Sequence, residues 1–318
     1  MRTRAFNALR GAVIGCAEVV PGISGGTVAL VLGIYERLLS ALGDIVSAGV
    51  ALVRKDGKRA RALLAGLEWS LLLPLVAGMA VAVLIGAAII PPLIDSYPRG
   101  STALFFGLIL GSLVVPWRMA RERRPWHWAI IALAAIVAFV VTGFPEREVS
   151  DVSKPAIFGA AAIAICALAL PGASGSYVLL ALGLYEPTLN AVNDRDLAYV
   201  AVFGAGAVTG LALFARVLTN LLANHRDITV AAMLGLMIGS LRALWPWSDD
   251  SRALHAPSGD PGEIVAIVAM ALLGVLIVRL LLLVSARRAK PEPPQPEPPR
   301  RAGTDQATRS SESAASSR

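Results

Sequence analysis

The chain has 318 residues, of which 56% are hydrophobic and only 16% are charged. Soluble domains carry about 25% charged residues, so this composition excludes an ordinary soluble protein and predicts a polytopic membrane protein. The net charge of +7 does not indicate a nucleic-acid partner, because the basic residues lie in short segments between apolar stretches, where they orient a protein in the membrane.

The first apolar region is interrupted by Pro-Gly-Ile-Ser-Gly at residues 21–25. The residues between Arg10 and Arg37 are too many for one straight helical span and too few for two. Both flanks are basic, so the positive-inside rule places both on the cytoplasmic side. We therefore predict a re-entrant helical hairpin over residues 11–39, with its tip at the Pro-Gly break.

Three complete membrane spans are predicted next, over residues 69–90, 101–117 and 126–144, because each approaches the roughly 20 apolar residues that cross a bilayer. The basic segments 54–61, which we expect to form a loop, and 118–124 are expected on the cytoplasmic side. The acidic segment 146–151 is expected outside. These charges agree with three alternating crossings.

The second half of the chain repeats the first. Residues 165–186, ICALALPGASGSYVLLALGLYE, match residues 15–36, GCAEVVPGISGGTVALVLGIYE, at a constant offset (171 − 21 = 185 − 35 = 150). Chance similarity of two apolar segments is the alternative, but Pro, Ser, Tyr and Glu also match. The repeat predicts a second hairpin over residues 155–185, followed by spans over residues 199–222, 229–247 and 263–284.

These elements predict an all-α polytopic membrane protein with inverted-topology repeats, each a re-entrant helical hairpin plus three transmembrane helices. The repeats cover residues 1–145 and 155–285. One hairpin plus three crossings is an odd number of crossings, so the second repeat is expected upside down. Residues 290–318 are rich in Pro, Ser and Arg and predict a disordered cytoplasmic tail. Both termini are expected on the cytoplasmic side of the membrane.

The hairpin tips carry the predicted chemistry. In each hairpin the second half-helix begins at the break, where its first N–H groups have no intrahelical partner and the helix dipole is positive. Two such ends suit a phosphate or another oxyanion. The alternative is that the same residues only cap helices in a kinked structural segment. The candidate substrate phosphate-binding residues are Gly22, Ser24, Gly25, Gly26, Thr27, Gly172, Ser174, Gly175 and Ser176.

Glu18 is an ionisable residue close to the first tip, and its counterpart in the second repeat is Leu168. A carboxylate within a membrane is costly and therefore indicates function. We expect proton coupling or gating at Glu18; the alternative is a structural partner for a nearby arginine. Three arginines near span ends are candidate phosphate partners, unless they only extend to the membrane interface. They are Arg216, Arg242 and Arg279.

No Cys/His cluster and no nucleophile–base motif is present in the sequence, so we expect no metal site, no cofactor and no catalytic residue. Cys16 and Cys166 occupy equivalent repeat positions within apolar segments. There, small residues that allow close helix packing are expected rather than a disulfide.

The segments AEVVPGISGGTVALVLGIYERLL and LALPGASGSYVLLALGLYE resemble the bacterial polyprenyl-phosphate transporter family, formerly labelled a domain of unknown function. The resemblance covers about residues 5–285. It implies a flippase that translocates undecaprenyl or decaprenyl phosphate between leaflets, so that the cell-wall lipid carrier is recycled. The family's glycine–serine motifs fall on the two tips, although the second tip has Ser176-Tyr177 where the first has Gly26-Thr27.

Two other functions remain as alternatives. A channel or carrier for small anions or carboxylates could use the same helix ends. A membrane enzyme acting on lipid pyrophosphate would belong to a different class, and the missing His/Arg/Asp constellation argues against it. A lipid substrate requires a lateral opening between spans, whereas a soluble anion requires a closed, wet pore.

Overall fold

The computed structural model describes residues 2–19, 24–122, 124–144, 152–172, 175–249 and 252–288. Its first compact unit is Met1–Leu283, and the account below concerns that unit. Within the described ranges the regular structure is helical, apart from one isolated bridge between Ser248 and Leu254. The predicted all-α class is therefore confirmed. The predicted tail, residues 290–318, and the tip residues Gly22 and Ser174 lie outside the described residues.

Both predicted helix breaks are present. Helix α1 (Arg2–Val19) ends before the first Pro-Gly sequence and α2 (Gly25–Val31) begins after it. In the second repeat, α9 (Lys154–Ala169) is followed by α10 (Gly175–Ala181). Their placement as re-entrant hairpins in a membrane stays a prediction.

Each returning arm is broken a second time, which the prediction of simple hairpins missed. Gly33 and Gly183 have φ values of 68° and 73°, a left-handed conformation that glycine adopts without steric cost. Helices α3 (Tyr35–Val53) and α11 (Tyr185–Asn193) start directly after these turns. The repeat thus extends to the backbone conformation of this turn.

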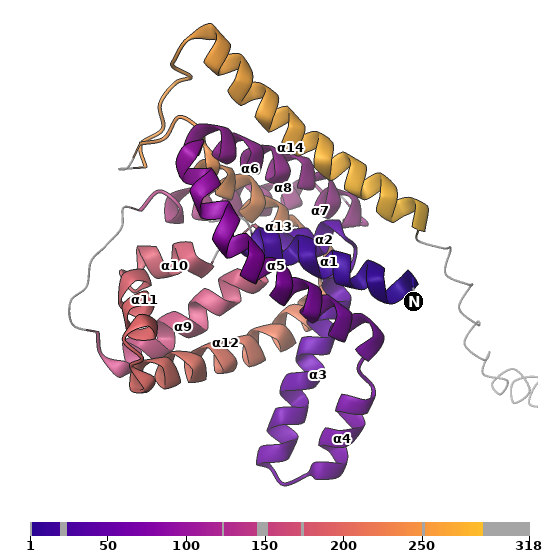
Figure 1. Ribbon diagram of the computed structural model, residues 1–318. Coiled ribbons are helices and arrows are strands. Elements are labelled where there is room, and N and C mark those ends of the chain that lie inside the picture. Colours follow the sequence, from indigo (N-terminus) through magenta and orange to yellow (C-terminus); the bar gives the residue numbers. More distant parts are fainter. Residues whose placement is uncertain are drawn as a thin grey trace, which may run out of the picture. The chain divides into compact units, whose positions relative to one another are not determined.

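The basic segment 54–61 was expected as a loop, and this expectation was wrong for most of it. Asp56 caps the helix α4 (Gly57–Ala65) by accepting a hydrogen bond from the N–H of Arg59. Helices α3 and α4 lie side by side (Figure 1) around a small core of Ala48, Ala51 and Ala60. The offset between matching residues falls from 150 at the tips to 128 in the later spans (206 − 78 = 235 − 107 = 128), so the first repeat has an insertion of 22 residues (150 − 128). The helical hairpin of α3 and α4 lies at this insertion.

Five helical segments are long and apolar enough to cross a membrane within the described residues. They are α5 (Trp69–Ser96), α6 (Pro98–Ser112) continued by α7 (Val114–Met119), α12 (Leu197–Asn224), α13 (Arg226–Ser240) continued by the 3₁₀ helix η1 (Leu241–Leu244), and α14 (Pro261–Arg288). The remaining predicted span corresponds to α8 (Pro125–Val141), an apolar helix of 17 residues. This length is at the lower limit for a transmembrane helix.

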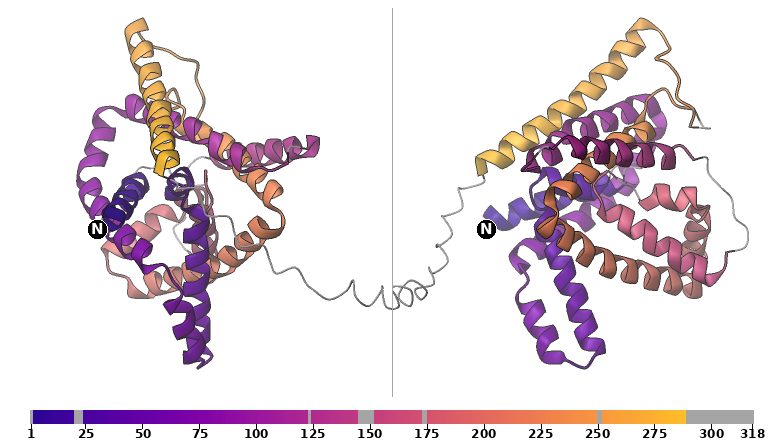
Figure 2. Two further views of the ribbon diagram at one scale, coloured as in Figure 1. Left: turned by 90° about the vertical axis from the view of Figure 1, so that its right-hand side faces the viewer. Right: turned by 180° about the vertical axis from the view of Figure 1, so that it is seen from behind.

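Glycines set the closest helix contacts. A Cβ added at Gly78 of α5 would lie 2.0 Å from the carbonyl oxygen of Ala8 in α1. The matching Gly206 of α12 approaches the carbonyl oxygen of Phe158 in α9 in the same way, at 2.3 Å. Figure 1 and Figure 2 show α9 and α12 running side by side. Small residues of this kind let membrane helices pack closely.

The last two helices of each repeat exchange partners. Gly107 of α6 packs on Ala271 of α14, and the matching Gly235 of α13 packs on Ile131 of α8; an added Cβ would lie 1.9 Å and 2.3 Å from the respective carbonyl oxygens. The third span of each repeat therefore contacts the second span of the other repeat.

Candidate functional site

The two helix breaks meet through Ser24. Ser24 caps α2, and its hydroxyl accepts a hydrogen bond from the N–H of Gly26 at 3.1 Å. The same hydroxyl donates to the carbonyl oxygen of Leu168, at the end of α9, at 3.1 Å. Ser24 is buried. A serine predicted from the first repeat therefore bonds to the backbone of the second.

Two further hydroxyl groups join the breaks. The Thr27 hydroxyl accepts a hydrogen bond from the N–H of Gly172 at 2.9 Å, and the Tyr35 hydroxyl donates to the carbonyl oxygen of Ala169 at 2.8 Å. Gly172 has φ 82°, and a Cβ there would lie 2.5 Å from Cγ of Met237. Both the conformation and the close approach therefore require glycine at this position.

Glu18 belongs to the last turn of α1, and its carboxylate lies at the start of α2. Its carboxylate accepts a hydrogen bond from the N–H of Gly25 at 3.0 Å, and a Cβ at Gly25 would lie 2.1 Å from the same carboxylate oxygen. An anionic group of the protein itself therefore occupies the position predicted for a substrate anion at this tip. Among the described residues no ion pair joins Glu18 to an arginine.

The second tip is different. Gly175, the first residue of α10, is buried, and a Cβ there would lie 2.7 Å from the carbonyl oxygen of Ala164. Ser176 is half-buried. Leu168 stands at the position of Glu18, so this tip has no carboxylate of its own. The two tips are therefore chemically unequal, as their sequences suggest.

Two of the three candidate arginines contact other parts of the protein, and the third is exposed. Arg216 of α12 donates to the Ser47 hydroxyl of α3 at 3.4 Å. Arg242 of η1 lies over the ring of Phe139, 4.4 Å from its centroid. Arg279 is on an exposed face of α14. None of these contacts involves a tip residue, so the structure does not bring the arginines together with the predicted phosphate site.

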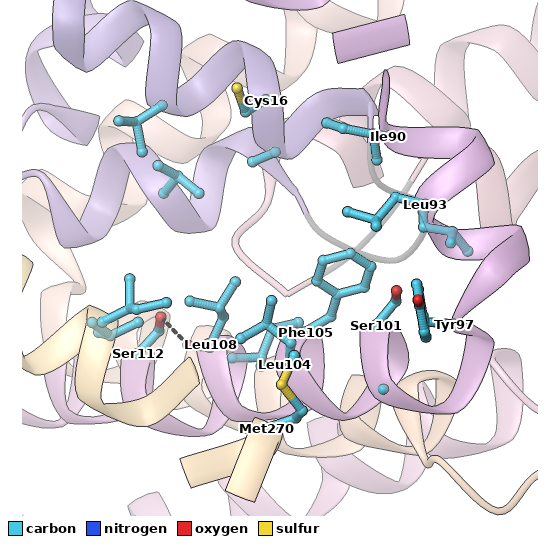
Figure 3. A pocket seen from close by; sticks show the side chains of 18 of the residues that line it. Cys16, Ile90, Leu93, Tyr97, Ser101, Leu104, Phe105, Leu108, Ser112 and Met270 are labelled. Atoms are coloured by element: carbon cyan, nitrogen blue, oxygen red, sulfur yellow. Dashed lines mark hydrogen bonds between the residues drawn. The ribbon is translucent and has the colours of Figure 1, made fainter. Parts of the chain in front are cut away.

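A cavity of about 1100 Å³ lies beside the first tip. Figure 3 shows Cys16 and Ile90 on one side of it, facing Leu104, Phe105 and Leu108 on the other. Its wall is formed by α1, α2, α5, α6 and α14 and is almost entirely apolar. Thr27 belongs both to this wall and to the junction of the two breaks. The cavity therefore extends to the predicted anion site.

Two charged residues, Arg99 and Glu263, also line the cavity, and they are the only charged ones among its described lining residues. Arg99 donates to the Glu263 carboxylate at 2.8 Å. The sequence analysis missed both. Their signal was their position, because each lies at the start of a long apolar stretch on the side predicted to be outside.

Neither cysteine forms a disulfide; both are free thiols. The part of the chain that the structure describes holds no group of three or more His, Cys, Asp or Glu residues that could bind a metal ion.

A polytopic helical protein in which two broken helices meet beside a large apolar cavity has the architecture of a membrane transporter. The chain belongs to the undecaprenyl phosphate translocase-like family, whose family model matches residues 14–260.

Two relatives carry the name polyprenyl-phosphate transporter. The protein from Vibrio cholerae is 34% identical over 245 residues, which cover 76% of this chain and 77% of the relative. The protein from Staphylococcus aureus is 25% identical over 260 residues, which cover 76% and 86%. No solved structure matches the chain.

Proposed function

We propose that this protein is a flippase that translocates undecaprenyl or decaprenyl phosphate between the leaflets of the bacterial plasma membrane. The observation that carries the proposal is the apolar cavity beside the first tip. Its volume of about 1100 Å³ exceeds that of most pockets for drug-sized ligands, roughly 300–1000 Å³. An apolar wall of this extent suits a polyprenyl chain, and the names of the relatives agree with this substrate.

The small-anion alternative fits the cavity poorly. A soluble anion gains nothing from an apolar wall and loses its hydration there, whereas a prenyl chain keeps an apolar environment while its headgroup leaves the membrane surface. The transporter names of the relatives also argue against the membrane-enzyme alternative.

The phosphate is proposed to bind at the tips, where Thr27 lines the cavity and Ser24 and Gly26 share a hydrogen bond at the start of α2. Glu18 already accepts the N–H of Gly25, so the phosphate and the Glu18 carboxylate compete for this donor. Protonation of Glu18 weakens its hold on the N–H group, because a neutral acceptor forms a weaker hydrogen bond than a charged one. Proton coupling or gating at Glu18 follows from this competition.

The proposed topology has inverted repeats and both termini in the cytoplasm. The charge distribution of the loops supports it, and so does the exchange of helix partners between the repeats. In this orientation the cavity mouth at Arg99 faces the outer leaflet, where the spent carrier is released. Return of the carrier to the cytoplasmic leaflet is then the direction of transport.

The direct test uses the purified full-length protein in lipid vesicles with fluorescent undecaprenyl phosphate and a leaflet-resolved quenching assay. We expect the protein to accelerate movement between leaflets. No acceleration over protein-free vesicles would refute the proposal. Transport of inorganic phosphate at a comparable rate would instead favour the small-anion carrier.

The role of Glu18 is tested by Glu18→Gln in the same vesicles. We expect transport to lose its dependence on a pH gradient while the lipid still binds. Glu186→Gln is the control, because Glu186 is exposed at the start of α11. If Glu18→Gln prevents stable insertion of the protein, Glu18 is a structural group.

A further inference from the structure

One ion pair connects α6 and α14, two of the helices that border the cavity. Arg99 is the second residue of α6 and Glu263 is the third residue of α14, and their side chains meet at 2.8 Å. Farther along, the same helices are in backbone contact, because a Cβ added at Gly274 would lie 2.3 Å from the carbonyl oxygen of Leu104. The ion pair therefore joins the starts of the two helices, and the close contact follows it in each of them.

The Arg99–Glu263 ion pair is exposed enough for a ligand to reach both side chains. The side chain of Arg99 is 51% exposed and that of Glu263 is 44% exposed. Ion pairs with this exposure contribute little to stability, since water competes for both partners. A phosphate can satisfy the same guanidinium with two parallel hydrogen bonds, so replacement of the carboxylate by a phosphate leaves Arg99 fully bonded.

The surroundings of Arg99 also favour an anion. Helix α6 begins with Pro98, which has no N–H, and no side chain caps its N-terminus. A Cβ added at Gly100 would have only Cβ of Tyr97 near it, at 4.0 Å, so there is space beside the backbone. Tyr97 and the buried Ser101 line this end of the cavity (Figure 3) and carry hydroxyl groups.

We propose that Arg99 is a headgroup-binding residue at the cavity mouth, where the phosphate of a polyprenyl lipid displaces Glu263. This inference rests on the proposed function and adds a second phosphate position, separate from the tips. The lipid chain lies along the apolar wall formed by residues such as Leu93, Phe105 and Met270. Displacement of Glu263 unlinks the starts of α6 and α14 while the lipid is bound.

The occupant is a lipid rather than free phosphate because charge and apolar surface are adjacent. Arg99 is the one cationic residue among the described residues that line the cavity, and the wall beyond it is apolar. A free phosphate would use Arg99 alone, whereas a prenyl phosphate uses Arg99 and the wall together.

The test is equilibrium binding of two lipids to full-length protein in nanodiscs: undecaprenyl phosphate, and undecaprenol, which lacks the phosphate. Loss of a charge-assisted hydrogen bond in Arg99→Gln should weaken undecaprenyl phosphate binding by about 10- to 150-fold. Glu263→Gln removes the competing carboxylate and should strengthen it by up to about fivefold. Neither variant should change undecaprenol binding.

Arg37→Gln and Glu68→Gln are matched controls, because Arg37 and Glu68 form a similarly exposed ion pair outside the cavity. Both should bind undecaprenyl phosphate as the wild type does. Equal weakening by Arg99→Gln and Glu263→Gln would show a structural clamp and overturn the inference, as would wild-type binding by both. If inorganic phosphate competed with undecaprenyl phosphate at concentrations equal to those of the lipid, the site would be a free-phosphate site instead. Failure of the wild-type protein to bind the lipid would refute the proposed function itself.

Discussion

The α6–α14 and α8–α13 contacts use matching glycines but border very different spaces. Phe105 of α6 lines the cavity of about 1100 Å³, whereas the matching Met233 of α13 (105 + 128 = 233) is 1% exposed in the hydrophobic core. A pocket lined by α7, α8 and α13 holds only about 20 Å³. The same helix crossing is therefore open beside one repeat and filled beside the other.

The difference arises from the neighbours of each crossing and not from the crossing itself. The α13 side is packed against the first tip and α12, which belong to the same core as Met233. The α6 side faces α1 and the end of α5 across the cavity. Transporters with inverted repeats alternate between states that open one side and close the other, so this comparison bears directly on the proposed topology.

The largest expected effect is a difference in stability between substitutions at Met233 and at the matching Phe105. Met233→Ala should lower the free energy of unfolding by about 2–5 kcal/mol, because it leaves a void in a filled core. Phe105→Ala should change stability by less than about 1 kcal/mol, because its ring already borders open space, but it should weaken undecaprenyl phosphate binding. Unfolding in mixed detergent micelles and lipid binding in nanodiscs measure the two effects. Equal destabilisation by both would mean that the two spaces are packed alike.

The two crossings themselves should respond alike to added volume. Gly107→Ala and Gly235→Ala each place a methyl group against a backbone carbonyl, so each should destabilise the protein by about 1–3 kcal/mol or more. Gly204→Ala is the control, because a Cβ added at Gly204 of α12 meets no atom within 4 Å. Its stability should be unchanged or slightly raised. A tolerated Gly107→Ala beside a damaging Gly235→Ala would show that only the α8–α13 crossing is tight.

The sequence allowed much of this architecture to be predicted, because its signals are local. Apolar length predicted the long helices, the Pro-Gly sequences predicted that α1 and α9 end and that α2 and α10 begin after them, and the repeat predicted which helices correspond. The α4 helix was missed because its charged sequence, GKRARALLA, has a weak apolar pattern and is stabilised by packing on α3.

The site was only partly predictable. Ser24 and Thr27 were proposed from the break, but their hydrogen-bond partners in the second repeat depend on tertiary contacts. The Glu18–Gly25 hydrogen bond could not be foreseen, since it joins the end of α1 to the start of α2 and depends on how the chain turns between them. The cavity is bounded by several helices, and no sequence pattern marks it. The ion pair at its mouth joins residues that are 164 positions apart in the chain.

The junction between the filled and open sides is tested at Thr27. Thr27→Val keeps the shape of the side chain but leaves the buried N–H of Gly172 without its acceptor, which should cost about 1–3 kcal/mol. Transport of undecaprenyl phosphate should fall as well, because the tip borders the cavity. Thr209→Val is the control, since among the described residues the Thr209 hydroxyl bonds to the carbonyl oxygen of Ala205, within its own exposed helical turn. Wild-type stability of Thr27→Val would show that the two breaks are held together by other contacts.

The smallest expected effect concerns the Arg37–Glu68 ion pair, which is the counterpart of the Arg99–Glu263 pair away from the cavity. Arg37 donates to the Glu68 carboxylate and thereby lowers the pKa of Glu68 below its ordinary value. The charged carboxylate is favoured in the folded protein, so its contribution is present at neutral pH and is lost as the pH falls below about 4.5. Because both side chains are exposed, the loss should not exceed about 0.5 kcal/mol.

This pair joins the start of α3 to the residue before α5, and so it closes the base of the α3–α4 insertion. Hydrogen exchange of the α4 amides in wild type and Glu68→Gln, compared at each pH, measures the contribution locally. The variant should exchange slightly faster at pH 7, and the difference should shrink as the pH falls below about 4.5 and through the lowered pKa of Glu68. A difference that persists at low pH would mean that Glu68 stabilises the insertion by packing and not by charge. In that case the pair would no longer serve as a purely electrostatic control for the pair at the cavity mouth.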